Sequence, residues 1–244
     1  MKPAINLRFY FFPAIIFLFI FLYSCKKERK KETTPANETG TVVDIQGHVY
    51  NTVKIGNQWW MAENLQVTLY NDSSLIFEVR STDHDTIWAN QQSGAYCSVD
   101  SRFGLLYNWY AVNDHKKIAP KGWHIPNDEE WKELEIELGM DDTEASKTAW
   151  RGTKERDKLI KEKSTDWGKD AYEFVGTNES GFTALTGGCR LFNGTMGEGK
   201  SGYWWTSSLN GNEAWYRYLS AFHTNIYRYH TYKNYGFSVR CVKD

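Results

Sequence analysis

The chain has 244 residues, with 29 Lys and Arg against 30 Asp and Glu, so its formal net charge is −1 at pH 7. Without a basic excess, the sequence lacks the usual electrostatic basis for binding nucleic acid. Eleven Trp, 15 Tyr and 19 Gly occur with few long apolar stretches, which indicates a mixed, loop-rich fold and not a helical bundle.

The N-terminus has the pattern of an export signal. Two basic residues precede an apolar run over residues 9–22, which is shorter than the roughly 20 residues of a membrane-spanning helix. The run leads into LYSC at residues 22–25, which resembles a bacterial lipobox, with a small residue before the cysteine. We therefore expect a signal peptide at residues 1–24, lipidation of Cys25, and anchoring in the cell envelope at the outer membrane. An uncleaved signal anchor is the alternative.

The residues after the predicted cleavage site divide into a tether and a domain. A charged run at 26–32 is followed by TTPANETG at 33–40, so residues 25–40 are expected to form a flexible tether. Residues 41–244 suffice for one hydrophobic core and are expected to form a single domain.

The first elements of this domain read as short strands. Residues 42–45 and 49–55 alternate apolar and polar residues around Gly47, which predicts a hairpin. A turn at Gly56-Asn57 then leads to a third strand that starts at residues 58–61.

Two main helices are expected in the middle of the chain. The apolar spacing over residues 104–112 fits a helix with one buried face. A second helix follows Asn127, with Trp131, Leu134 and Leu138 on one face. The acids at 128–130 complement the helix dipole, and we favour this capping role over a catalytic one.

The remainder of the chain is expected to alternate between a charged segment and short strands. Residues 143–163 predict a third helical stretch that is interrupted at Gly152. From residue 182 onward, Gly- and Asn-rich turns separate short strands.

Seven segments, in this order, resemble the Fibrobacter succinogenes major paralogous domain family, which is abundant in exported, often lipid-anchored bacterial proteins. The resemblance covers nearly the whole domain and leaves its biochemical role undefined. The segments are residues 44–64 (DIQGHVYNTVKIGNQWWMAEN), 94–97 (GAYC), 104–112 (GLLYNWYAV), 122–131 (GWHIPNDEEW), 178–190 (NESGFTALTGGCR), 202–208 (GYWWTSS) and 235–242 (YGFSVRCV).

A second resemblance concerns the fold. A helix, a Pro-capped helix with Glu130-Trp131 in its first turn, a Gly-Gly-x-Arg strand at 187–190 and a terminal Gly-Phe strand are similar to the C-type-lectin-like fold and to its variant in formylglycine-generating enzymes. This resemblance implies an α+β fold with two main helices packed on twisted antiparallel sheets and many loops.

The functional sites of those proteins have no counterpart in this sequence. The close C-terminal cysteine pair that binds copper and the triplets that bind calcium are both absent. Nucleophile elbows, phosphate loops and zinc motifs are absent too. We therefore expect no cofactor, no metal and no catalytic residue.

Three cysteines, Cys97, Cys189 and Cys241, remain after lipidation of Cys25, and they form no CxxC pair. If the C-type-lectin-like resemblance holds, the strand at 187–190 lies near the terminal strand. Cys189 and Cys241 are then the best disulfide pair, which leaves Cys97 free. Pairing of Cys97 with Cys241 is the alternative.

Two adjacent tryptophan pairs, Trp59-Trp60 and Trp204-Trp205, are candidate ligand contacts. Neighbours on a strand point to opposite faces, so one ring of each pair can face outward unless both faces are covered. An exposed ring offers a flat apolar surface on which a sugar can stack. Burial of all four rings in the core is the alternative.

The last strands predict an aromatic hairpin. Residues 215–219 (WYRYL) and 226–230 (IYRYH) each alternate with period two, as strands do. An antiparallel pairing with Tyr218 opposite Tyr227 places four tyrosines on one face, either as core or as a stacking platform. These are Tyr216, Tyr218, Tyr227 and Tyr229.

The same register places Arg217 opposite Arg228 on the other face. Directly opposed like charges are destabilising. Such a pair requires solvent, nearby acids or an anionic partner such as an acidic glycan.

The sequence as a whole predicts a membrane-anchored exported lipoprotein. Its aromatic-rich domain is expected to be non-catalytic and to bind a carbohydrate or an envelope protein, or to serve as a scaffold. An unrecognised glycan-active hydrolase or lyase is the alternative. That enzyme would need a carboxylate pair in a cleft, and no such pair stands out in the sequence.

Overall fold

The computed structural model describes residues 37–80, 83–161, 167 and 176–244. The predicted signal peptide, Cys25 and residues 26–36 of the predicted tether lie outside the described residues. Within the described part of the chain, no helix is both long enough and apolar enough to cross a membrane.

The first sheet joins the N-terminal strands to the end of the chain. Its strand order is β1-β2-β3-β15-β7, and every pairing is antiparallel. The strands are β1 (Thr39–Val43), β2 (Val49–Ile55), β3 (Gln58–Met61), β15 (Val242–Lys243) and β7 (Trp123–His124). Gly47 adopts φ 85° in the β1–β2 turn, where its N–H donates to the carbonyl of Asp44. The predicted hairpin and third strand are confirmed.

The second sheet has the order β10-β9-β14-β6-β5-β4. Its pairings are antiparallel except that of β4 with β5, which is parallel. The strands are β10 (Gly194–Met196), β9 (Cys189–Leu191), β14 (Gly236–Phe237), β6 (Leu106–Asn108), β5 (Ala95–Cys97) and β4 (Phe77–Glu78).

The third sheet is antiparallel, with the order β11-β12-β13-β8. Its strands are β11 (Ser201–Asn210), β12 (Glu213–Ser220), β13 (Ile226–Thr231) and β8 (Ala149–Arg151). Tyr218 lies opposite Tyr227 and Arg217 lies opposite Arg228. The register predicted for the aromatic hairpin is therefore confirmed.

The helices in the described residues are short. They are α1 (Asp85–Ala89), α2 (Trp109–Val112), α3 (Asp128–Glu137), α4 (Asp142–Ala145) and α5 (Glu155–Leu159), with a 3-10 turn at Ser101–Phe103. Only α3, with 10 residues, matches a predicted main helix. The predicted α+β, C-type-lectin-like architecture of two main helices on sheets is wrong, because most of the regular structure is β-sheet.

The helix predictions fail in one apolar stretch and one charged stretch. Residues 104–112 form β6 and then the single turn α2, because the Asn108 side chain accepts a hydrogen bond from the N–H of Ala111 (3.0 Å) and starts the helix only there. A short, fully buried apolar run fits a strand as well as a helix. Between residues 143 and 161, the strand β8 separates α4 from α5, where one helical stretch was expected.

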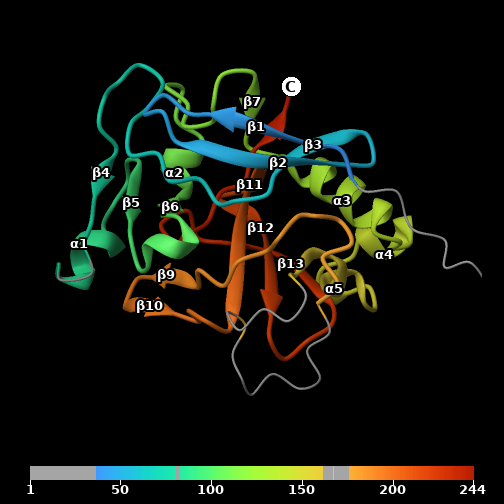
Figure 1. Ribbon diagram of the computed structural model, residues 1–244. Helices are drawn as coiled ribbons and strands as arrows, with labels where there is room; N and C mark the ends of the chain where they lie inside the picture. The colour runs from blue at the N-terminus through green and yellow to red at the C-terminus, as the bar shows by residue number, and fades with distance from the viewer. Residues whose placement is uncertain (1–36, 81–82, 162–166, 168–175) are drawn as a thin grey trace, which may run out of the picture. The chain divides into compact units, whose positions relative to one another are not determined.

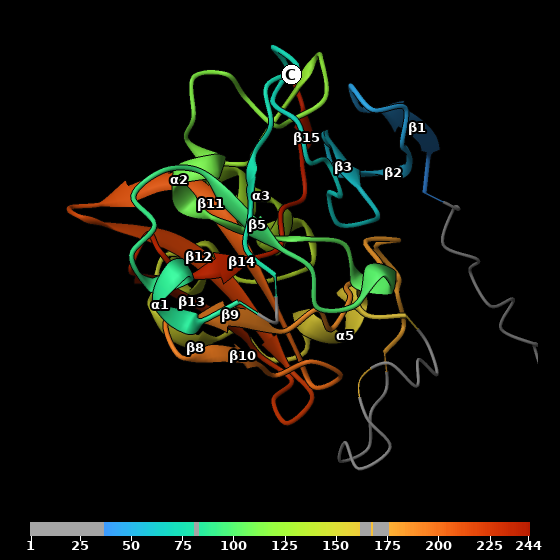
Figure 2. The ribbon, with the colours of Figure 1, turned by 90° about the vertical axis from the view of Figure 1, so that its left-hand side faces the viewer.

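The third sheet divides the main hydrophobic core in two. Trp204 and Trp205 are neighbours on β11 and point to opposite faces, and both are fully buried. In Figure 1 the third sheet stands between α3, α4 and α5 on the right and the second sheet on the left. Figure 2 is viewed from the side of the second sheet, with β5 and β9 toward the reader. Part of the third sheet is thus covered on both faces.

Candidate functional site

One face of the third sheet carries a row of aromatic rings with one ring from each strand. Tyr203 lies opposite Tyr218, Tyr218 opposite Tyr227, and Tyr227 opposite Trp150. The centroids of successive rings are 4.4, 5.8 and 5.0 Å apart. Cross-strand aromatic contacts of this kind stabilise a sheet, and here they run without a gap across all four strands.

A second row lies beside the first. Tyr216 faces Trp205 on β11 and Tyr229 on β13. Trp205 is buried, but the other rings of the two rows are half-buried or exposed. We call these six rings the aromatic face: Trp150, Tyr203, Tyr216, Tyr218, Tyr227 and Tyr229. His223 extends it, since its ring stacks on Trp150 at 3.8 Å between centroids.

The aromatic face is covered at one end and open at the other. Phe237 of β14 packs against Tyr203 and Tyr216, with ring centroids 5.1 and 5.0 Å apart. Tyr229 lies farther along the sheet, with 40% of its surface exposed. The open end is therefore the part of the face that another molecule can reach.

The aromatic face is uncharged. Its other paired strand positions hold Ser201, Leu209, Ala214, Ser220 and Thr231, so the paired positions of the described strands place no Asp, Glu, Lys or Arg on this side. Burial raises the pKa of the Tyr203, Tyr216 and Tyr227 hydroxyls above the usual value. These hydroxyls stay protonated near neutral pH, so they can donate and accept hydrogen bonds without carrying charge.

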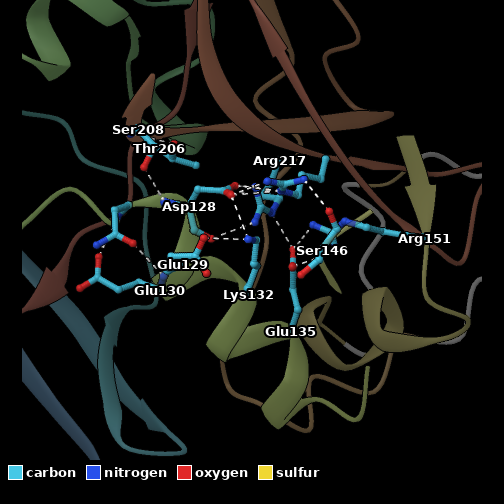
Figure 3. Close-up of polar contacts among 12 residues, drawn as sticks. Asp128, Glu129, Glu130, Lys132, Glu135, Ser146, Arg151, Thr206, Ser208 and Arg217 are labelled. Carbon is cyan, nitrogen blue, oxygen red and sulfur yellow. Dashed lines mark hydrogen bonds and ion pairs between the residues drawn. The ribbon is translucent and has the colours of Figure 1, made fainter. Parts of the chain in front are cut away.

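The opposite face of the same strands carries a buried ionic cluster, which Figure 3 shows. Arg217 donates to Oδ1 of Asp128 (2.7 Å), and Arg228 donates to Oδ2 of the same residue (2.6 Å). One carboxylate from the start of α3 thus lies between two arginines that face each other across β12 and β13. The guanidinium of Arg228 also lies 3.9 Å from the ring centroid of Trp215.

Glu135, which lies near the other end of α3 from Asp128, completes the cluster. Its Oε1 accepts from Arg217 (2.7 Å) and from Arg151 of β8 (2.9 Å). Glu135, Arg151 and Arg217 are all at most 1% exposed. The two acids and three arginines therefore form a chain of ion pairs that joins α3 to three strands of the third sheet.

The arginines hold Asp128 in its ionised form. Burial alone would raise the pKa of Asp128, but the hydrogen bond from Arg228 and the charge of Arg217 outweigh it and hold that pKa far below its usual range. In Arg217, burial would lower the pKa, yet Glu135 and Asp128 raise it. Both carboxylates accept hydrogen bonds from buried arginines. A general acid instead needs a carboxyl group with a raised pKa that is accessible to the substrate.

The first turn of α3 is capped as expected. The Asn127 side chain accepts from the N–H of Glu130, and the Glu130 side chain accepts from the N–H of Asn127. The Ser208 hydroxyl accepts from the N–H of Asp128 (2.9 Å). His124 lies beside this cap, 2.7 Å from Glu130 on one ring nitrogen and 2.7 Å from Asp244 on the other.

The structure overturns part of the predicted ligand site. Trp60, Trp204 and Trp205 are fully buried, and Arg217 and Arg228 are 0% and 6% exposed. Trp204 and Trp205 cannot contact a glycan, because both faces of the third sheet are covered where they lie. Trp60 is packed against Trp131 and Phe182, and Asp128 and Glu135 satisfy the two arginines. Trp59 is half-buried beside Gly40. The four predicted tyrosines do share one face, as expected.

The predicted Cys189–Cys241 disulfide is not formed, because Cys97, Cys189 and Cys241 are all buried free thiols. Gly236 of β14 pairs with Arg190 of β9, so the terminal strand does lie beside the strand of Cys189. Cys241, however, follows that pairing by five residues, and an extended chain advances about 3.3 Å per residue. Cys241 therefore lies past the point at which the two strands pair.

Three aromatic residues of this region were not predicted from the sequence: Trp150 and Tyr203 of the aromatic face, and His223, which extends it. Trp150 lies in the segment expected to be helical, so no strand partner could be assigned to it. Tyr203 could have been found, since it lies two residues before Trp205 and so shares its side of β11. His223 lies in the turn region after β12, and no periodicity in the sequence marks its stacking on Trp150.

Metal ligation finds no support in the described part of the chain. No group of three or more His, Cys, Asp or Glu side chains is arranged there to hold an ion. Among the histidines, His124 contacts two carboxylates and His223 stacks on an aromatic ring.

Comparison with known proteins identifies a family. A sequence model of the Fibrobacter succinogenes major domain matches residues 53–243, which begin within β2 and include the third sheet and α3. No curated protein and no solved structure matches the chain. The resemblance to this family seen in the sequence is thereby confirmed.

Proposed function

The chain belongs to the Fibrobacter succinogenes major domain family, and we propose that it is a non-catalytic binding protein whose aromatic face holds an uncharged saccharide in the bacterial cell envelope. The observation that carries this proposal is the uninterrupted row Tyr203, Tyr218, Tyr227 and Trp150, which runs across four strands and opens to solvent toward Tyr229.

The chemistry of the face suits a sugar. Tyrosine rings offer flat apolar surface for the C–H side of a sugar ring, and their protonated hydroxyls can exchange hydrogen bonds with sugar hydroxyls. The row is rigid, since each ring contacts the next, so little side-chain entropy is lost when a ligand binds. Because this side of the strands carries no charge, it favours a neutral saccharide over the acidic glycan expected from the sequence.

The buried acids of α3 argue for binding over hydrolysis. A hydrolase needs two carboxyl groups that reach the substrate, one of them with an available proton. Asp128 and Glu135 are 5% and 0% exposed and hold three arginines on the side of the sheet opposite the aromatic face. These two groups therefore serve the fold.

The lipid anchor belongs to the same proposal. Cys25 carries the lipid after removal of residues 1–24. The residues between Cys25 and β1, which begins at Thr39 and so shortens the tether expected at 25–40, link the domain to the outer membrane, where it meets envelope glycans or proteins. The basis is the order of basic residues, apolar run and small residue before Cys25. Cys25→Ala is expected to abolish partition of the mature-size protein into detergent. Detergent partition of a mature-size Cys25→Ala protein would disprove the anchor.

A glycan array tests the binding proposal. The purified protein is expected to bind uncharged oligosaccharides, and Tyr227→Ala/Tyr229→Ala is expected to lose that signal. Phe77→Ala is the matched control, because Phe77 is a similarly exposed aromatic residue on β4, in another sheet. Binding of acidic glycans alone, or equal signals from all three proteins, would contradict the proposal.

A further inference from the structure

Two hollows include Trp123 of β7 in their lining, and neither is lined by a residue of the aromatic face. The first has a volume of about 400 Å³ and is lined by Asp44, Asn71, Lys121 and Asp244 among others. The second has a volume of about 350 Å³ and reaches Ser207. Lys117 and Trp123 line both hollows, so these two residues lie where the hollows meet. Each volume lies within the range of small-molecule sites.

The acids in this region are already paired. Asp44 accepts from the Tyr50 hydroxyl (2.6 Å) and contacts His48 (2.9 Å). Asp244 contacts His124 (2.7 Å). In the second hollow, Asp114 contacts His115 (3.2 Å) and accepts from the N–H of Lys116 (3.0 Å).

The lysines are not paired. Lys117 and Lys121 are exposed, and within the described residues neither ammonium group has an acidic partner within ion-pair distance. Two ammonium groups are therefore free to contact a ligand at the first hollow, whose lining includes the ring of Trp123, whereas Asp44 and Asp244 are held by the partners named above. Ammonium groups and an aromatic surface are the combination that recognises a sugar bearing a negative charge.

The backbone fixes the position of Lys117. Its φ is 56°, in the left-handed region that favours glycine. Asn71 holds this loop, since its N–H donates to the Lys117 carbonyl (2.9 Å) and its side chain donates to the Ala119 carbonyl (2.9 Å). The contacts from Asn71 therefore hold the backbone of Lys117 in this strained conformation.

We infer that these hollows form a second site, which binds an anionic saccharide. The sugar ring stacks on Trp123, and its carboxylate or phosphate group contacts Lys117 and Lys121. In the second hollow, Ser207 and Asn113 face the sugar hydroxyls. This site shares no residue with the aromatic face, so either can exist without the other.

Isothermal titration calorimetry at low ionic strength tests the site with three probes: trigalacturonate for a carboxylate, mannose 6-phosphate for a phosphate, and maltotriose as the neutral comparison. At least one anionic probe is expected to bind and to weaken with added salt. Lys117→Gln/Lys121→Gln is expected to weaken that binding by about tenfold or more, which corresponds to about 1.4 kcal/mol. Whichever anionic probe binds identifies the acidic group.

The matched control is Lys154→Gln, because Lys154 is exposed and lies outside both hollows. It is expected to bind like the unmodified protein, as is Tyr227→Ala/Tyr229→Ala. Failure of both anionic probes to bind would overturn the inference. So would equal affinity in the double lysine variant, or binding of maltotriose that is as tight as that of the anionic probes.

Discussion

Arg217 and Arg228 lie directly opposite each other on β12 and β13, and both donate to the same carboxylate, that of Asp128. Their repulsion is offset because α3 brings a shared anion to the midpoint of the pair. Since side chains alternate along a strand, fixing the arginines against α3 also fixes Tyr216, Tyr218 and Tyr227 on the other side. The ionic cluster therefore sets the orientation of the aromatic face.

Asp128→Asn is expected to destabilise the protein strongly. It leaves two buried arginines without their shared anion, and removal of one partner from a buried ion pair costs about 3–5 kcal/mol. Glu129→Gln is the control, because Glu129 lies in the same helical turn but is 75% exposed and pairs with Lys132, so a change within about 0.5 kcal/mol is expected. Urea unfolding measures both, and similar stabilities for the two variants would show that the cluster contributes little.

Arg217→Gln is expected to cost at least about 3 kcal/mol, because it leaves Asp128 and Glu135 buried with fewer donors. Arg80→Gln, which removes an exposed ion pair with Glu78, should change stability by less than about 0.5 kcal/mol. The comparison uses melting temperature and urea titration. An unchanged melting temperature in Arg217→Gln would revive the alternative that this arginine serves a ligand.

His124 makes stability depend on pH. Burial opposes its protonation, but the hydrogen bonds that its ring donates to Asp244 and Glu130 outweigh burial and raise its pKa above the usual value. The stabilisation is therefore complete below about pH 6.5 and is lost as the pH rises through the higher folded-state pKa. Urea unfolding at a series of pH values should show this decline, and His124→Gln should remove it. Because the ring is 40% exposed, added salt should reduce the effect.

The cysteines of the domain should react with a thiol reagent only after unfolding. Cys97, Cys189 and Cys241 are buried, and burial raises the pKa of Cys97 and Cys189 to about 12, which suppresses the reactive thiolate. In the native protein all three are expected to be slow, and in guanidinium chloride all three should titrate without a reductant. Loss of two thiols from the unfolded count would reveal a disulfide.

Local patterns in the sequence were enough to predict several elements. The β12–β13 register follows from two alternating pentapeptides, which place Tyr218 opposite Tyr227. The start of α3 follows from Asn127 and the acids after it. Each of these features depends on residues close together in the chain, where periodicity and capping chemistry decide the structure.

The rest depends on contacts between distant segments. Asp128 and Arg228 are 100 residues apart, so no local pattern pairs them. The burial of Trp204 and Trp205 requires cover on both faces of β11, which comes from α3 on one side and β14 on the other. Trp150 belongs to the aromatic face because β8 pairs with β13, and no local pattern in the sequence predicts that pairing.

Calorimetric titration with uncharged hexasaccharides is the most direct test of the aromatic face as the binding surface. A panel of cellohexaose, xylohexaose, mannohexaose and maltohexaose is titrated into the unmodified protein, Tyr227→Ala/Tyr229→Ala and Phe77→Ala. At least one hexasaccharide should bind the unmodified protein and Phe77→Ala equally, and bind the double tyrosine variant about tenfold more weakly or worse, because two stacking rings are lost. Failure of every hexasaccharide to bind would contradict this role of the aromatic face, and so would a folded double tyrosine variant that binds as tightly as the unmodified protein.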